Sequence, residues 1–158
     1  MLFRSLFGIQ SRGGCACAGP YGHRLLDIDT ATSDAYRASV GAGFEGIKPG
    51  WTRLNFNYFI DQTEFNFLLE AIEFIATYGE RFVTLYDFNW QTGAWTHKQD
   101  SSQHVSLFDF VPATFEPSPA NFQAYLEEAR AVADSLENPA DREIPNGVPT
   151  ELVFFRHR

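Results

Sequence analysis

The sequence predicts a mixed α/β (α+β) fold in which helices pack against a sheet and a β-hairpin is added. Three patterns indicate this: apolar residues at helical spacing over 62–78, alternation of apolar and polar residues over 51–58, and two β-rich runs around a glycine turn at 91–93. A chain of 158 residues buries about 70% of its unfolded surface, so we expect a single domain.

The N-terminal elements are short. The apolar spacing predicts the end of a helix at 2–7, a short strand at 8–11, and then a loop of small residues at 12–20. Glycines in this loop permit positive φ and close backbone approach. A short helix is expected over 21–27, and Thr32-Ser33-Asp34 predicts the cap of a second helix to about Phe44, weakened by Gly41 and Gly43.

A strand and a long helix are predicted in the middle of the chain. After the turn Lys48-Pro49-Gly50, alternation over 51–58 places apolar and polar side chains on opposite faces, which is typical of a half-buried strand. Asp61-Gln62-Thr63-Glu64 is close to the capping-box pattern, and it predicts a helix over 62–78 that ends near Gly79.

The C-terminal half predicts a hairpin and a further helix. The runs 81–90 and 94–97 form the hairpin, joined by residues 91–93. Ser118-Pro119 predicts the start of a helix that ends before Asn138-Pro139, and a last strand is expected at 152–155. We divide the chain into a motif-bearing part at 1–79, the hairpin and a loop at 80–115, and the last helix with its tail at 118–158.

Composition excludes several classes of function. The formal net charge is −8, the pI is about 4.9, and Lys and Arg form no cluster, so nucleic acid is not an expected partner. No apolar run reaches the length of a membrane span or of a signal peptide, which predicts the cytoplasm and no membrane partner. Only Cys15 and Cys17 are present, too closely spaced for an ordinary disulfide.

The loop around the cysteines carries a resemblance to a known family. Its residues match the pattern R-x-G-x-x-C-A-x-P at Arg12, Gly14, Cys17, Ala18 and Pro20. This resembles the catalytic loop of cysteine desulfurases and selenocysteine lyases, which belong to the class V aminotransferases. The run Trp51-Thr52-Arg53-Leu54-Asn55-Phe56 and the helix that follows resemble the family's next segment.

The resemblance implies a fold and a set of roles. The fold would be the C-terminal small domain of a fold type I transferase that depends on pyridoxal phosphate. Cys17 would be the catalytic nucleophile, because a thiolate attacks activated sulfur. Arg53 would hold the substrate carboxylate through two parallel hydrogen bonds, assisted by Asn55. Arg12 and His23 would favour the thiolate form of the cysteine.

The resemblance also implies what this segment lacks. The family's Schiff-base lysine belongs to a large domain that precedes the cysteine loop, and Thr96-His97-Lys98 copies the family's S-x-H-K motif only superficially. Lys48 is the other lysine. We therefore expect no pyridoxal phosphate on this chain alone, and a partner that is either the missing large domain or a separate subunit. The intact enzyme would be a homodimer acting on an amino acid, and the chain would be a truncated product, a split subunit or a fragment.

Other interpretations stay open. The chain could be a non-catalytic, thiol-bearing module that binds a partner or accepts sulfur. Cys17 could be a small buried residue, Arg53 a surface ion-pair partner, and Cys15 a passive loop residue. The scattered histidines do not favour a zinc site. The substrate is open between cysteine, selenocysteine and other amino acids, and loss of the large domain predicts an exposed apolar surface.

Overall fold

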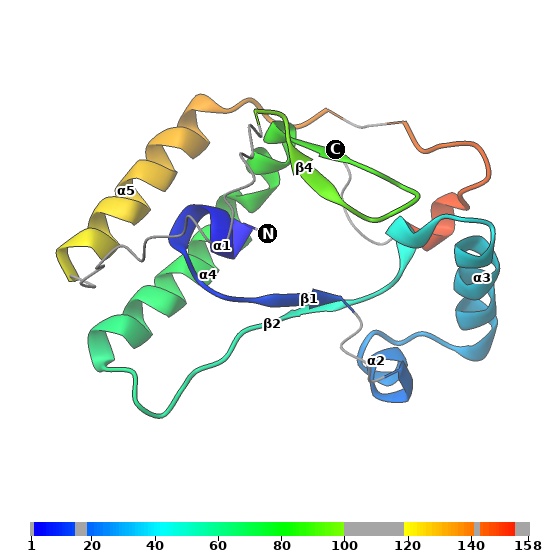
Figure 1. Cartoon of the computed structure of the whole chain (residues 1–158), viewed down its shortest axis with the longest axis horizontal. Helices are drawn as coiled ribbons and strands as arrows, with labels where there is room; N and C mark the ends of the chain where they lie inside the picture. The colour runs from blue at the N-terminus through cyan, green and yellow to red at the C-terminus, as the bar shows by residue number, and fades with distance from the viewer. Residues whose placement is uncertain (1, 15–18, 100–118, 141–142, 154–158) are drawn as a thin grey trace, which may run out of the picture.

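The computed structural model describes residues 2–14, 19–99, 119–140 and 143–153, and its secondary structure is mixed (Figure 1). The described strands form two separate two-stranded antiparallel sheets, β1–β2 and β3–β4. The coarse mixed class is therefore confirmed. The elements in order are α1 (Leu2–Phe7), β1 (Arg12–Gly14), α2 (Gly19–Leu25), α3 (Thr30–Gly41), β2 (Trp51–Arg53), α4 (Gln62–Phe82), β3 (Tyr86–Phe88), β4 (Trp95–His97) and α5 (Pro119–Ser135).

The capping box predicted before α4 is confirmed. The Asp61 carboxylate accepts a hydrogen bond from the Glu64 backbone N–H at 2.8 Å, and the Glu64 carboxylate accepts one from the Asp61 N–H at 3.2 Å. The predicted end near Gly79 is wrong, because the helix continues to Phe82. Gly79 is buried, and a Cβ there would lie 3.3 Å from the Leu2 side chain. This glycine serves the packing of α1 on α4.

Aromatic side chains dominate the larger core, which we call the phenylalanine core. Phe7 of α1 makes edge-to-face contacts with Phe67 and Phe74 of α4, at ring-centroid distances of 6.0 and 5.5 Å. Phe67 also stacks on Phe122 of α5 at 4.3 Å. Helices α1 and α5 thus pack along α4 (Figure 1). The buried members are Phe7, Phe67, Ala71, Phe74, Phe82, Ala129 and Ala133.

A second, smaller core joins α3 to the C-terminal segment. Its buried members are Tyr36, Ile47, Val148 and Leu152. The Tyr36 hydroxyl donates to the Leu152 carbonyl at 3.0 Å, and burial raises the pKa of this phenol. Residues Thr150–Leu152 form a 3-10 helix and Val153 is not in a strand, so the strand predicted at 152–155 is wrong for its described part. Residues 154 and 155 lie outside the described residues.

The cap of α3 differs from the predicted one. Asp29 is the N-cap, and its carboxylate accepts from the Thr32 N–H at 2.7 Å, which lowers the pKa of Asp29. The helix ends at Gly41, before Gly43 with φ +100°. Thr32-Ser33-Asp34 therefore lies inside α3, and the predicted span to Phe44 is too long.

The strand predicted at 8–11 is also wrong. Gly8 has φ +65°, and its N–H donates to the Arg4 carbonyl while Ile9 N–H donates to that of Phe3. These bonds satisfy the last carbonyls of α1, as is common at a helix end with a glycine. The backbone of Gly8 and Ile9 thus forms the end of the helix rather than a strand, and the strand begins only at Arg12.

The predicted hairpin is confirmed with a shorter first strand. Tyr86 pairs with His97 and Phe88 with Trp95, and Gly93 in the connection has φ +71°. Residues 81–85, predicted as strand, instead end α4 and form a 3-10 turn. Helix α5 confirms the last predicted helix, whereas Ser118 of its predicted cap lies outside the described residues.

Candidate functional site

The two segments that carry the predicted site residues form one antiparallel pair of strands, the arginine ribbon (β1 and β2; Figure 1). Its register places Arg12 opposite Arg53, Gly13 opposite Thr52 and Gly14 opposite Trp51. Residues 15–18, which include Cys17, lie outside the described residues and connect β1 to α2. The strand that enters the cysteine loop is therefore hydrogen-bonded to the strand that carries the predicted carboxylate arginine.

Arg12 and Arg53 form a like-charge cross-strand pair. Residues directly opposite in an antiparallel pair project from the same face, so the two side chains share one face of the ribbon. Both residues are exposed, and within the described residues no carboxylate forms an ion pair with either. Like charges in this arrangement repel each other. A bound anion would relieve that repulsion.

His23 lies on α2, which leaves the cysteine loop, and the residue is half-buried. It lines a small cavity of about 150 Å³ together with Trp51 of the ribbon. Because Trp51 and Arg53 are two residues apart in a strand, they share a face. The structure thus pairs the strands of Arg12 and Arg53, and it places His23 and Trp51 at one cavity beside them. The cavity is lined by Gly19, Gly22, His23, Leu26, Lys48, Pro49 and Trp51.

The strand predicted over 51–58 is wrong beyond Arg53, where β2 ends. Its partner β1 begins at Arg12, opposite Arg53, so the ladder of hydrogen bonds stops there. Asn55 therefore lies outside the strand and is exposed, and its assistance to Arg53 stays a prediction. Tyr58, predicted on a half-buried face, is 100% exposed, and Phe56 is also exposed.

Each of the two lysines has a polar partner in the structure. The Lys48 ammonium pairs with the Glu45 carboxylate at 3.0 Å, and that of Lys98 donates to the Thr84 carbonyl at 2.7 Å. The expectation that this chain alone does not hold pyridoxal phosphate stays a prediction. Among the described residues, no group of three or more His, Cys, Asp and Glu side chains converges on a metal position.

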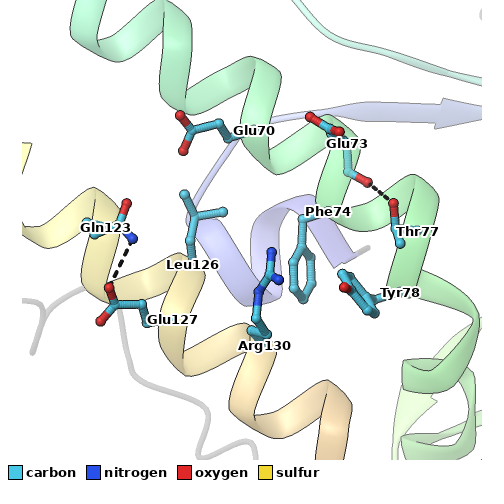
Figure 2. A pocket seen from close by; sticks show the side chains of 9 residues that line it. All are labelled: Glu70, Glu73, Phe74, Thr77, Tyr78, Gln123, Leu126, Glu127 and Arg130. Atoms are coloured by element: carbon cyan, nitrogen blue, oxygen red, sulfur yellow. Dashed lines mark hydrogen bonds between the residues drawn. The ribbon is translucent and has the colours of Figure 1, made fainter.

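Sequence reasoning missed a groove of about 430 Å³ between α4 and α5 (Figure 2). Carboxylates of Glu70, Glu73 and Glu127 line it, and the Arg130 guanidinium lies over the Tyr78 ring, 5.5 Å from its centroid. Polar residues at helical spacing on α4 were the feature of the sequence that could have indicated this groove. With three carboxylates and one guanidinium, the groove has the wrong charge for an amino-acid carboxylate, so it is not the predicted site.

Comparison with known proteins gives no assignment. No protein-family model matches the chain, and neither a curated protein nor a solved structure matches it. In the part of the chain that the structure describes, no helix has both the length and the apolar character needed to cross a bilayer. The motif in the cysteine loop and the geometry of the arginine ribbon are therefore the features from which a function can be inferred.

Proposed function

We propose that this chain is the thiol-bearing part of a pyridoxal-phosphate-dependent enzyme similar to class V aminotransferases and cysteine desulfurases, and that it is inactive alone. The observation that supports this proposal is the register of the arginine ribbon, which pairs Arg12 with Arg53. These arginines come from two motifs that are far apart in the sequence. Their pairing brings a carboxylate-binding group next to the strand that leads to Cys17.

In this proposal the arginine ribbon binds the carboxylate of an amino-acid substrate. The planar guanidinium of Arg53 can donate two parallel hydrogen bonds to a carboxylate, and Arg12 on the same face adds a second positive charge. Both groups are exposed, so a ligand can reach them. Binding an anion also removes the repulsion between them, which makes the free energy of binding more favourable.

Cys17 provides the nucleophile in the same proposal. Positive charge near a cysteine favours its thiolate form, the reactive form of the side chain. Arg12 lies in the strand before the cysteine loop, and His23 lies in the helix after it. Both are therefore on the elements that border the loop, as their proposed role in supporting the thiolate requires.

The cofactor and its lysine would come from another polypeptide segment, either a large domain or a separate subunit. Pyridoxal phosphate supplies stabilisation of a carbanion on the bound amino acid. Because Lys48 and Lys98 are engaged elsewhere, we assign no cofactor contact to this chain. The exposed aromatic residues Phe56, Tyr58 and Phe59, which follow Arg53 in the sequence, support a partner surface beside the site.

Carboxylate binding is the first test. The purified chain is titrated at low ionic strength with L-alanine and with L-alaninamide, and backbone amide NMR shifts of Gly13 and Thr52 are followed. We expect a saturable response to L-alanine and none to the amide. Arg53→Gln should weaken binding at least tenfold, because the paired hydrogen bonds are lost, whereas Arg37→Gln on α3 should not. Equal binding of the amide, or by the Arg53→Gln variant, contradicts the proposal.

Dependence on a second polypeptide is tested with the cofactor itself. The chain is mixed with pyridoxal phosphate, treated with borohydride and analysed by mass spectrometry. We expect no stoichiometric adduct on Lys48 or Lys98, because both ammonium groups are engaged. A stoichiometric adduct on one of them, together with absorbance at about 400–430 nm from an internal aldimine, would show that the chain holds the cofactor unaided.

A further inference from the structure

A tight turn at Asn146 and Gly147 leads the chain into the second core. The Val148 N–H donates to the Pro145 carbonyl at 3.1 Å, and Gly147 between them has φ +97°. A positive φ at the third residue of a turn is typical of type II turns, and glycine adopts it readily. Asn146 and Gly147 are exposed, whereas Val148 is only 7% exposed. The turn therefore joins an exposed amide side chain to a buried core residue.

An asparagine that precedes glycine is able to modify itself. The backbone nitrogen of the next residue loses its proton to hydroxide and attacks the side-chain amide carbon. A C–N bond forms, ammonia leaves with a proton taken from water, and the product is a cyclic succinimide. Water then opens the ring at either carbonyl and gives aspartate or isoaspartate, so the net reaction consumes one water and involves no oxidant or reductant. The attack is intramolecular, which favours it, and glycine has no side chain to obstruct it.

The sequence and the structure single out Asn146 for this reaction. Six of the seven asparagines precede an aromatic residue or proline, and only Asn146 precedes glycine. Proline has no N–H to lose, and a bulky side chain crowds the approach of the nitrogen. Within the described residues, no hydrogen bond uses the Gly147 N–H as its donor. The attacking nitrogen is therefore not held by a competing partner.

We propose that Asn146 and Gly147 form a self-modification site, and that conversion to isoaspartate detaches the C-terminal segment from α3. Isoaspartate continues the chain through its side-chain carbonyl, which adds one backbone carbon, and a C–C bond is about 1.5 Å long. The turn then cannot keep both its hydrogen bond and the place of Val148 in the core. Val148 packs with Tyr36, whose hydroxyl donates to the Leu152 carbonyl at 3.0 Å. Figure 1 shows this segment beside α3.

The site is tested by ageing the parent chain at mildly alkaline pH and following every asparagine by peptide mass spectrometry. An isoaspartyl methyltransferase with a labelled methyl donor distinguishes isoaspartate from aspartate. Isoaspartate should form at 146 at least about tenfold faster than at any other asparagine, because only there is the intramolecular attack unobstructed. Asn146→Gln should remove the product, because a longer side chain closes the ring less readily. No modification at 146, or comparable rates at several asparagines, overturns the inference.

The structural consequence is tested by amide hydrogen exchange. The N–H groups of Val148 and Leu152 donate to the carbonyls of Pro145 and Pro149. In the isoaspartate form, separated by ion exchange, these amides should exchange at least about fivefold faster than in the parent, because the segment opens locally. Amides of α4 should be unchanged, because the phenylalanine core shares no buried residue with the second core.

Asn146→Asp, measured before ageing, is the matched control, because it adds the same charge without lengthening the backbone. Its amides should exchange within about twofold of the parent. Unchanged exchange in the isoaspartate form, an equal rise in the aspartate variant, or a rise of similar size in α4 overturns the selective detachment. Neither measurement involves the arginine ribbon. A failed carboxylate titration would therefore reject the proposed function and leave this inference standing.

Discussion

The phenylalanine core and the arginine ribbon differ in how deeply their side chains are buried. In the core, aromatic rings of α1, α4 and α5 are buried against one another. In the ribbon, every residue except the half-buried Trp51 is exposed, and a Cβ on Gly50, just before β2, would lie 2.7 Å from the Gly14 carbonyl carbon. Burial of apolar area supplies most of the free energy of folding. Substitutions in the core should therefore lower the free energy of unfolding, and those in the ribbon should mainly change the proposed binding of a carboxylate.

The largest expected effect is in the core. Phe82 is 1% exposed and contacts Phe74 edge to face at 6.1 Å. Phe82→Ala should lower the free energy of unfolding by about 3–5 kcal/mol, because it removes buried apolar area and leaves a cavity. Urea denaturation followed by circular dichroism measures this change.

Tyr58→Ala is the matched control for that aromatic-to-alanine change, because Tyr58 is 100% exposed. A surface substitution of this kind should alter the free energy of unfolding by less than about 0.5 kcal/mol. Equal losses at Phe82 and Tyr58 would mean that the two regions do not differ in the way their exposure indicates. A loss of stability for Tyr58→Ala alone would mean that packing in the segment after the ribbon contributes more to stability than packing at Phe82.

The second core should show an intermediate effect. Tyr36→Phe keeps the ring and removes the hydroxyl that donates to the Leu152 carbonyl, so it should cost about 1–3 kcal/mol. Burial raises the pKa of Tyr36 above its ordinary value of 10.0, so its contribution is complete below pH 10.0 and is lost as pH rises through the higher folded-state pKa. Denaturation between pH 8 and pH 11 should show a steeper decline for the parent than for Tyr36→Phe. Parallel declines would contradict this assignment.

Local patterns in the sequence predicted the elements that depend on local interactions. The capping box of Asp61 and Glu64 and the apolar spacing after it were sufficient for α4. Local patterns gave wrong helix ends where a contact with a residue distant in the sequence determines the structure. Gly79 has the character of a helix end in the sequence, yet it continues the helix because it packs on Leu2. Several residues near the start of α3 are of a type that can cap a helix. The sequence pattern therefore did not distinguish Asp29, which is the N-cap, from Thr32.

The sequence motifs named candidate site residues, whose roles stay predictions, but not the geometry that relates them. The motifs selected Arg12 and Arg53, whereas their register depends on pairing between strands that are distant in the sequence. Alternation over 51–58 indicated which side chains would share a face of a strand, but it could not reveal that the partner strand begins only at Arg12, opposite Arg53. The contact between Gly22 and Trp51 joins α2 to the ribbon, and no local pattern in the sequence marks it.

The smallest expected effect is a gain in the free energy of unfolding, whereas the substitutions above lower it or leave it nearly unchanged. Arg53→Gln removes one charge from a like-charge cross-strand pair, so it should raise the free energy of unfolding by about 0.2–1 kcal/mol at low salt. Salt screens exposed charges, so the gain should vanish near 1 M salt. Urea denaturation of parent and variant at both salt concentrations measures the difference, with Arg37→Gln as the control because Arg37 pairs with Asp34. A loss of stability at low salt would mean that Arg53 makes a favourable contact in the free chain, and its availability to a carboxylate would then have to be rejected. A gain in the free energy of unfolding at low salt, combined with loss of carboxylate binding, is expected if Arg53 binds a ligand although its charge destabilises the free chain.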